Sequence, residues 1–153
     1  MAPPKSCSGL GVLGALAVEI FGLGHMAKMM RILLVDDEPT ILLGLSYFLR
    51  RAGAHVISCL GREEAKEAIE SEVFNLALLD VRLSGGDPHA GLELMSLLKQ
   101  RSPDTHVVIM TAYGSDEIRR EAMARGAFHY YNKPINLDHL LGLIRSLPQV
   151  SSC

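Results

Sequence analysis

The sequence predicts an α/β domain built on a doubly wound parallel sheet with helices on both faces. Five short apolar runs alternate along the chain with segments whose apolar residues recur at helical spacing. Unbroken apolar runs are typical of strands buried on both faces of a parallel sheet. Right-handed crossovers then place the helices on both sides of the sheet. The 153 residues suffice for one such domain.

The first half of the pattern begins with an expected strand at residues 32–35, which runs directly into the acids Asp36, Asp37 and Glu38. Pro39 suits the first turn of the next helix, where its missing N–H is not needed. Apolar residues then recur at helical spacing until Gly53, a residue that commonly ends a helix. A shorter strand at 55–59 and a charged helix at 61–70 follow.

The second half repeats the alternation. Residues 74–80 form an apolar run that stops on Asp80, and a helix is expected at 92–100. The next strand, 107–110, ends at Thr111, and Ser115 can cap a helix that stops at Gly126. The remaining expected elements are a strand at 128–132, followed by Lys133-Pro134, and a last helix that begins at Asn136 or Asp138.

Polar side chains follow four of the five expected strands. In an open α/β sheet the carboxyl ends of the strands meet at one edge, where ligands bind. The residues that should converge there are Asp36, Asp37, Asp80, Thr111 and Lys133. Each has a plainer explanation alone, because an acid or a threonine can simply end a strand and a lysine can simply neutralise acids. Together they favour a functional site.

The chemistry expected there is phosphoryl transfer to a carboxylate. Three carboxylates repel one another unless a hard cation such as Mg²⁺ lies among them. We expect Asp37 and Asp80 to bind Mg²⁺ directly, Asp36 to act through water, and the backbone carbonyl of Arg82 to be a further ligand. Asp80 is then the nucleophile that forms an aspartyl phosphate. Thr111 and Lys133 would supply a hydroxyl and a positive charge to the phosphoryl oxygens.

Four segments together resemble the receiver domain of two-component response regulators: 32–39 (ILLVDDEP), 78–80 (LLD), 110–112 (MTA) and 130–134 (YYNKP). The resemblance covers about residues 31–147. It implies a flavodoxin-like fold with strand order 2-1-3-4-5 and phosphotransfer from a phosphohistidine. The donor would be a sensor histidine kinase or a histidine phosphotransfer protein. The three scattered cysteines independently indicate a reduced, cytoplasmic compartment. The resemblance also implies that the chain is not an enzyme, although it could catalyse its own phosphorylation and dephosphorylation.

The resemblance also implies an aromatic switch at Tyr130, which would reorient with Thr111 and remodel the face made by the fourth helix, fifth strand and fifth helix. It implies a cis bond between Lys133 and Pro134. Neighbours on a strand point to opposite faces, so Tyr130 and Tyr131 should separate. The output would be a downstream protein or a domain beyond this sequence, and phosphorylation could drive a homodimer.

Three features depart from that family. The loop after Asp80 is enlarged over residues 84–90, and His89 could approach the site. Arg82 and Tyr113 stand two residues past Asp80 and Thr111, where a bulky ring could shield the phosphoryl group from water. Residues 1–30 match nothing in the family, so we assign the receiver domain to residues 31–150.

Residues 1–30 suggest an atypical extension, which could be disordered or could lie upstream of a natural start at Met26, Met29 or Met30. Their apolar run, 10–23, is too short to span a bilayer. The GxGxxG at 9–14 lacks the preceding strand that a dinucleotide site needs. A helix that binds a partner or a membrane surface is the alternative.

Composition excludes other classes of function. A net charge of −2 gives no basic surface for nucleic acid, and three scattered cysteines form no zinc motif.

One alternative function is an aspartyl-phosphate hydrolase of the haloacid-dehalogenase type, which needs an acid where Arg82 stands. The other is a pseudo-receiver that binds partners without phosphorylation, against which the complete set of site residues argues.

Overall fold

The computed structural model describes residues 30–84, 87 and 89–148. The expectations for residues 1–29 lie outside these residues. The elements alternate as predicted, in the order β1 Arg31–Val35, α2 Pro39–Arg51, β2 His55–Cys59, α3 Arg62–Ser71, β3 Leu76–Asp80, α4 Ala90–Arg101, β4 His106–Thr111, α5 Asp116–Ala124, β5 His129–Asn132 and α6 Leu137–Ser146. None of the described helices is long and apolar enough to cross a bilayer.

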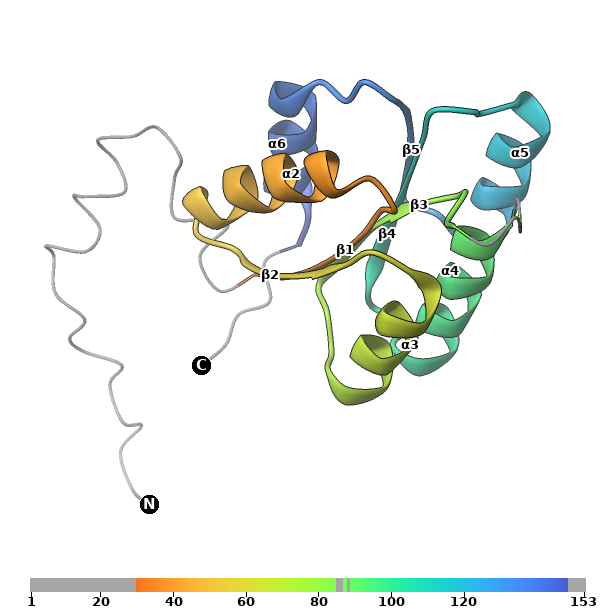
Figure 1. The fold of residues 1–153 in the computed structure, drawn as a ribbon, viewed down its shortest axis with the longest axis horizontal. Helices are drawn as coiled ribbons and strands as arrows, with labels where there is room; N and C mark the ends of the chain where they lie inside the picture. Colours follow the sequence, from red (N-terminus) through yellow and green to blue (C-terminus); the bar gives the residue numbers. More distant parts are fainter. Residues whose placement is uncertain (1–29, 85–86, 88, 149–153) are drawn as a thin grey trace, which may run out of the picture.

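The five strands form one parallel sheet in the order β2-β1-β3-β4-β5, which confirms the predicted topology. Figure 1 shows α2 and α6 on one face of this sheet and α3, α4 and α5 on the other. All five residues of β3 are buried. A strand at the centre of a doubly covered sheet has no solvent-facing side, which explains why its sequence does not alternate.

Alternate residues of each strand feed two separate cores. Leu33 of β1 packs with α3, α4 and α5, whereas Leu34 packs with α2 and α6. The same alternation separates the tyrosines of β5, since Tyr130 belongs to the first core and Tyr131 packs against the second. The predicted separation of these two rings is therefore confirmed.

Local signals in the sequence account for several helix ends. The Ser115 hydroxyl accepts a hydrogen bond from the Ile118 amide at 3.2 Å, and the Asn136 side chain accepts one from the His139 amide at 3.0 Å. Asn136, not Asp138, is thus the cap of α6. Gly53 follows the end of α2 with a φ of 94°, a conformation that favours glycine.

Two strands begin later than the apolar runs suggest. β3 starts at Leu76, although Phe74 is buried. The Phe74 carbonyl accepts its hydrogen bond from the Thr105 hydroxyl at 2.7 Å, so a side chain provides its partner. β5 likewise starts at His129, after Phe128.

Candidate functional site

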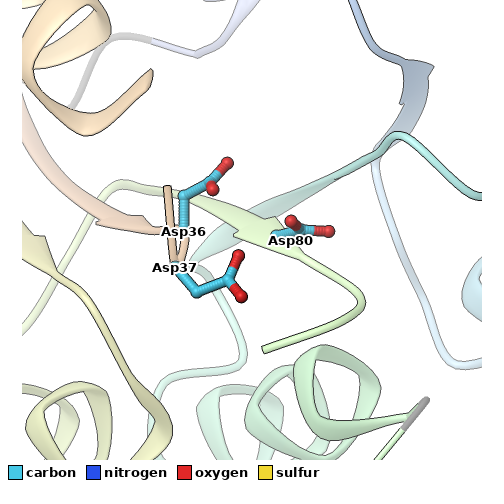
Figure 2. A group of neighbouring side chains, drawn as sticks. All are labelled: Asp36, Asp37 and Asp80. Carbon is cyan, nitrogen blue, oxygen red and sulfur yellow. The ribbon is translucent and has the colours of Figure 1, made fainter. Parts of the chain in front are cut away.

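Three acids meet at the carboxyl edge of the sheet. Asp36 and Asp37 follow β1, and Asp80 ends β3, which pairs with β1 so that Val35 lies opposite Leu79. One carboxylate oxygen from each acid lies within 4.8 Å of the others (Figure 2). Asp36 is fully buried and Asp80 is 5% exposed, whereas Asp37 is half-buried. Side chains 44 positions apart in sequence thus share one small volume, as the topology predicts.

Lys133, which follows β5, supplies the positive charge that faces these acids. Its Nζ donates hydrogen bonds to Asp36 Oδ2 at 2.5 Å and to Asp80 Oδ2 at 2.9 Å. Its side chain is 7% exposed, so both ion pairs are shielded from water. The peptide bond between Lys133 and Pro134 is cis, as the resemblance to receiver domains implies.

Burial and pairing act in opposite directions on the ionisation of this group. Burial raises the pKa of Asp80 above its ordinary value of 3.8, and the hydrogen bond and charge of Lys133 counteract this. Burial by itself lowers the pKa of Lys133, but its bonds to Asp36 and Asp80 outweigh burial, so its pKa is raised. Lys133 is therefore a fixed cation at neutral pH.

The oxygens of the three acids differ in what they already bind. Asp36 Oδ1 accepts a hydrogen bond from the Glu38 amide at 2.9 Å, while Oδ2 is taken by Lys133. Asp37 Oδ2 accepts from the Ser84 hydroxyl at 3.1 Å, and Asp80 Oδ1 accepts from the Arg82 amide at 3.3 Å. Asp36 is thus committed to protein partners at both oxygens, which fits an indirect role. This role of Ser84 is not predictable from the sequence, because a serine in a long loop carries no distinguishing signal.

The donor set suits a hard divalent cation. Three carboxylates face one buried lysine, so the cluster keeps an excess of negative charge. Mg²⁺ is commonly bound by one or two carboxylates together with waters. Asp37 and Asp80 fit this pattern, since both carry oxygens within 4.8 Å of each other and Asp37 lies closer to solvent.

Thr111 ends β4, the strand beside β3, and is 1% exposed. Its Oγ1 accepts a hydrogen bond from the Tyr113 amide at 3.2 Å, which leaves the hydroxyl hydrogen able to donate elsewhere. The Tyr113 ring is 68% exposed, and the Arg82 guanidinium carbon lies 5.0 Å from its centroid. The two residues that follow Asp80 and Thr111 at the same spacing therefore stack on each other.

The enlarged loop between β3 and α4 is held at several points. The Gly91 amide donates to the Val81 carbonyl at 3.0 Å, and a Cβ on Gly91 would lie 2.0 Å from the Asp80 carbonyl oxygen. Further along, Arg62 of α3 pairs with Asp87 at 3.3 Å. His89, which the sequence suggested could approach the site, instead lies 3.7 Å from Glu121 of α5.

Tyr130 lies inside the protein, beside the strand ends. It is 9% exposed, and its hydroxyl has no hydrogen-bond partner within the part of the chain that the structure describes. Burial raises the pKa of this hydroxyl, so it stays protonated at neutral pH. The Tyr130 side chain is thus packed in the core that faces α5, and its predicted role as a switch stays a prediction.

The profile of one protein family, the response regulator receiver domain, matches residues 32–145. The response regulator protein PilR of Pseudomonas aeruginosa is 39% identical over 112 residues, which are 73% of this chain and 24% of PilR. The chain thus spans about a quarter of the length of that relative.

Solved structures give the same result. A CheY-like receiver domain protein from Methanospirillum hungatei superimposes with a TM-score of 0.71 at 33% identity, covering 77% of this chain and 92% of that one. TrrA of Thermotoga maritima, solved in complex with Mg²⁺-BeF, has a TM-score of 0.67 at 30% identity and covers 78% of this chain and 100% of that one. With the matching profile, strand order and strand-end residues, this chain belongs to the family of response regulator receiver domains.

Proposed function

We propose that this chain is a phosphoacceptor module in which Asp80 takes a phosphoryl group from the phosphohistidine of a sensor kinase or a histidine phosphotransfer protein. The observation that carries this proposal is the buried arrangement of Asp80 with Lys133, Asp36 and Asp37. A buried acid cluster that faces a single lysine is costly to maintain for stability alone. The cluster lies at the carboxyl edge of the sheet, where ligands bind in open α/β folds, which favours a role in function.

Asp80 acts as the nucleophile. A carboxylate oxygen attacks phosphorus, the bond between phosphorus and the donor's imidazole nitrogen breaks, and its electron pair returns to that nitrogen. Lys133 lies 2.9 Å from Asp80 Oδ2, close enough to pair with the new phosphoryl oxygens. The Thr111 hydroxyl can donate to another of these oxygens, since its own acceptor position is already used by Tyr113.

Asp37 and Asp80 would hold Mg²⁺ directly, with Asp36 acting through water and the Arg82 carbonyl as a further ligand. The ion supplies positive charge that offsets repulsion between the acids and the incoming phosphoryl group. Asp36 would instead help to fix the geometry of the site, because its two carboxylate oxygens accept hydrogen bonds from the Glu38 amide and from Lys133 Nζ.

Phosphorylation would act on partners through Thr111 and Tyr130. A change at Thr111, at the end of β4, reaches β5 because Thr111 lies opposite Asn132 in the register. The face formed by α5, β5 and α6 would then change and be read by a downstream protein, by an output domain or by a second copy of this chain. The PilR relative is much longer than this chain, which accords with an output carried elsewhere.

The stacked pair of Arg82 and Tyr113 would control how long the phosphoryl group lasts. The guanidinium carbon of Arg82 lies 5.0 Å from the centroid of the exposed Tyr113 ring, and the Arg82 backbone amide donates a hydrogen bond to Asp80 Oδ1. Such a pair can restrict the approach of water and slow hydrolysis. The identity of residue 82 argues against a haloacid-dehalogenase mechanism, because Arg82 occupies the position of the second acid.

The deciding experiment is incubation with Mg²⁺ and a small phosphodonor such as acetyl phosphate, followed by intact mass measurement. We expect one phosphoryl adduct in the wild type and in Asp104→Asn, an exposed acid outside the cluster. No adduct is expected in Asp80→Asn or after addition of EDTA. An unlabelled wild type, or labelling that survives Asp80→Asn, would refute the proposal. Labelling that persists in EDTA would remove the role of Mg²⁺.

A further inference from the structure

Gly114, in the loop between β4 and α5, passes directly over Tyr130. A Cβ at this position would lie 2.1 Å from the Tyr130 hydroxyl oxygen, 2.6 Å from Asn132 Oδ1 and 3.1 Å from Thr111 Cγ2. The first two separations are below 3.0 Å, a distance that a Cβ atom in a protein essentially never shows to a non-bonded heavy atom. Even the smallest side chain at residue 114 therefore requires a neighbour to move.

The three neighbours differ in how they can respond. Asn132 is exposed, so its amide can rotate away, and the Thr111 methyl needs to shift by only a few tenths of an ångström. Tyr130 carries a rigid ring with two rotatable bonds, and the atom that would be struck is its far end. The ring cannot shorten, so it must swing as a unit.

The inward position of Tyr130 depends on shape alone. Its ring is packed among residues of the core that faces α5, while its hydroxyl is buried without a partner among the described residues. A buried, unpaired hydroxyl opposes the inward position, because water would satisfy it outside. No hydrogen bond is therefore available to hold the ring if the space above it is reduced.

We propose that Gly114 is the positioning residue that admits the Tyr130 ring to its buried position. The size of the side chain at residue 114 then determines whether the ring lies inside or outside. The description of Tyr130 as a switch rests on the proposed function, whereas the steric relation between residues 114 and 130 does not. The φ of Gly114 is not among the positive values found for the described glycines, so alanine there is resisted by contact and not by backbone strain.

The direct test labels the chain with 3-fluorotyrosine and measures ¹⁹F NMR with a soluble gadolinium chelate, without Mg²⁺ or phosphodonor. The chain has four tyrosines, and the Tyr130 signal is assigned by its loss in Tyr130→Phe. In the wild type we expect this signal to be protected, unlike those of Tyr47 and Tyr113, which are 62% and 68% exposed. In Gly114→Ala it should broaden as those two do. A signal that stays protected in Gly114→Ala would overturn the proposal.

Thermal denaturation provides the second measurement and covers poor folding of the variant. Gly142→Ala in α6 is the matched control, since nothing lies within 4 Å of a Cβ there. Gly114→Ala should lower the melting temperature relative to Gly142→Ala. The loss caused by Gly114→Ala should be at least halved when it is measured in a Tyr130→Phe background, because that background lacks the oxygen 2.1 Å from the new methyl. No loss in the wild-type background, or an equal loss in both backgrounds, would refute the steric relation.

The two proposals fail in different measurements. An unlabelled wild type in the phosphodonor experiment would end the phosphoacceptor proposal and leave the fluorine result standing. Protected fluorine in Gly114→Ala would end the present inference, whatever the labelling of Asp80. A phosphoryl adduct on Gly114→Ala, together with an exposed Tyr130, would show that residue 114 acts on the ring and not on the chemistry.

Discussion

Replacing Lys133 with methionine would leave two buried carboxylates without their shared cation. The Lys133 side chain is 7% exposed, as is that of Asp80, and Asp36 is fully buried. Removing one member of a buried ion pair typically costs about 3–5 kcal/mol of folding free energy. For a domain of this size that corresponds to a fall in melting temperature of roughly 10–20 °C. Methionine keeps the length of the side chain, so lost packing contributes little.

The deficit should depend on pH in a defined direction. Lys133 counteracts the effect of burial on Asp80, so its removal raises the pKa of Asp80 further above 3.8. A native pKa above the unfolded one means that the protonated acid is favoured in the fold, so stability is greatest below about pH 4 and is lost as pH rises through the raised value. The difference between variant and wild type should therefore be smaller at pH 5 than at pH 8.

Urea denaturation followed by circular dichroism, with EDTA present, measures this difference at both pH values. Lys66→Met is the matched control, because Lys66 pairs at 3.0 Å with Glu63, whose side chain is 79% exposed. Such a surface pair is worth about 1 kcal/mol or less. The prediction is contradicted if the free energy of unfolding of Lys133→Met lies within about 1 kcal/mol of the wild-type value, or if its deficit is the same at pH 5 and pH 8.

Three further predictions concern neighbouring residues. Asp37→Asn removes one of three like charges within 4.8 Å and should raise stability in EDTA by about 1 kcal/mol. We expect Mg²⁺ to raise the melting temperature of the wild type but not that of Asp37→Asn, and an equal response to Mg²⁺ in both would contradict the role of Asp37. Tyr113→Ala should shorten the half-life of phosphorylated Asp80, followed by intact mass over time, and an unchanged half-life would exclude the shielding role. Cys59 is 3% exposed, and burial raises its pKa to about 11. It should resist iodoacetamide at pH 8 until denaturant is added, as peptide mapping would show, whereas rapid alkylation of the native chain would contradict its burial.

The fold was predictable because each strand of a doubly covered parallel sheet must be apolar on both sides. That requirement marks strands such as β3 as continuous runs, and it also separates Tyr130 from Tyr131, since neighbouring residues feed different cores. The ends of elements were less predictable. Phe74 is as buried as a strand residue but lies before β3, and its carbonyl accepts a hydrogen bond from the Thr105 side chain, 31 residues later.

For the site, topology brought the acids and Lys133 together, because residues at strand ends meet whatever their separation in sequence. The partners of individual atoms could not be predicted in the same way. The stacking of Arg82 on Tyr113 and the bond from Ser84 to Asp37 depend on rotamers of side chains from separate loops. Gly114 was missed for a related reason. A glycine in a loop most often signals a special backbone angle, whereas this one is required by the ring beneath it.

A backbone hydrogen bond closes the loop between β3 and α4 at its base. The length of the loop can therefore change without changing the geometry of the acid site below it. The Gly91 amide and the Val81 carbonyl are bonded at 3.0 Å, and Gly91 lies against the Asp80 backbone. The free-energy cost of closing a loop grows only with the logarithm of the loop length, by about 0.6 kcal/mol for each doubling. Residues can therefore be gained or lost above this closure while Asp80 and the first turn of α4 stay where they are. Related receiver domains can therefore differ in the length of this loop, and so in the surface around the acids, while the acids keep their positions.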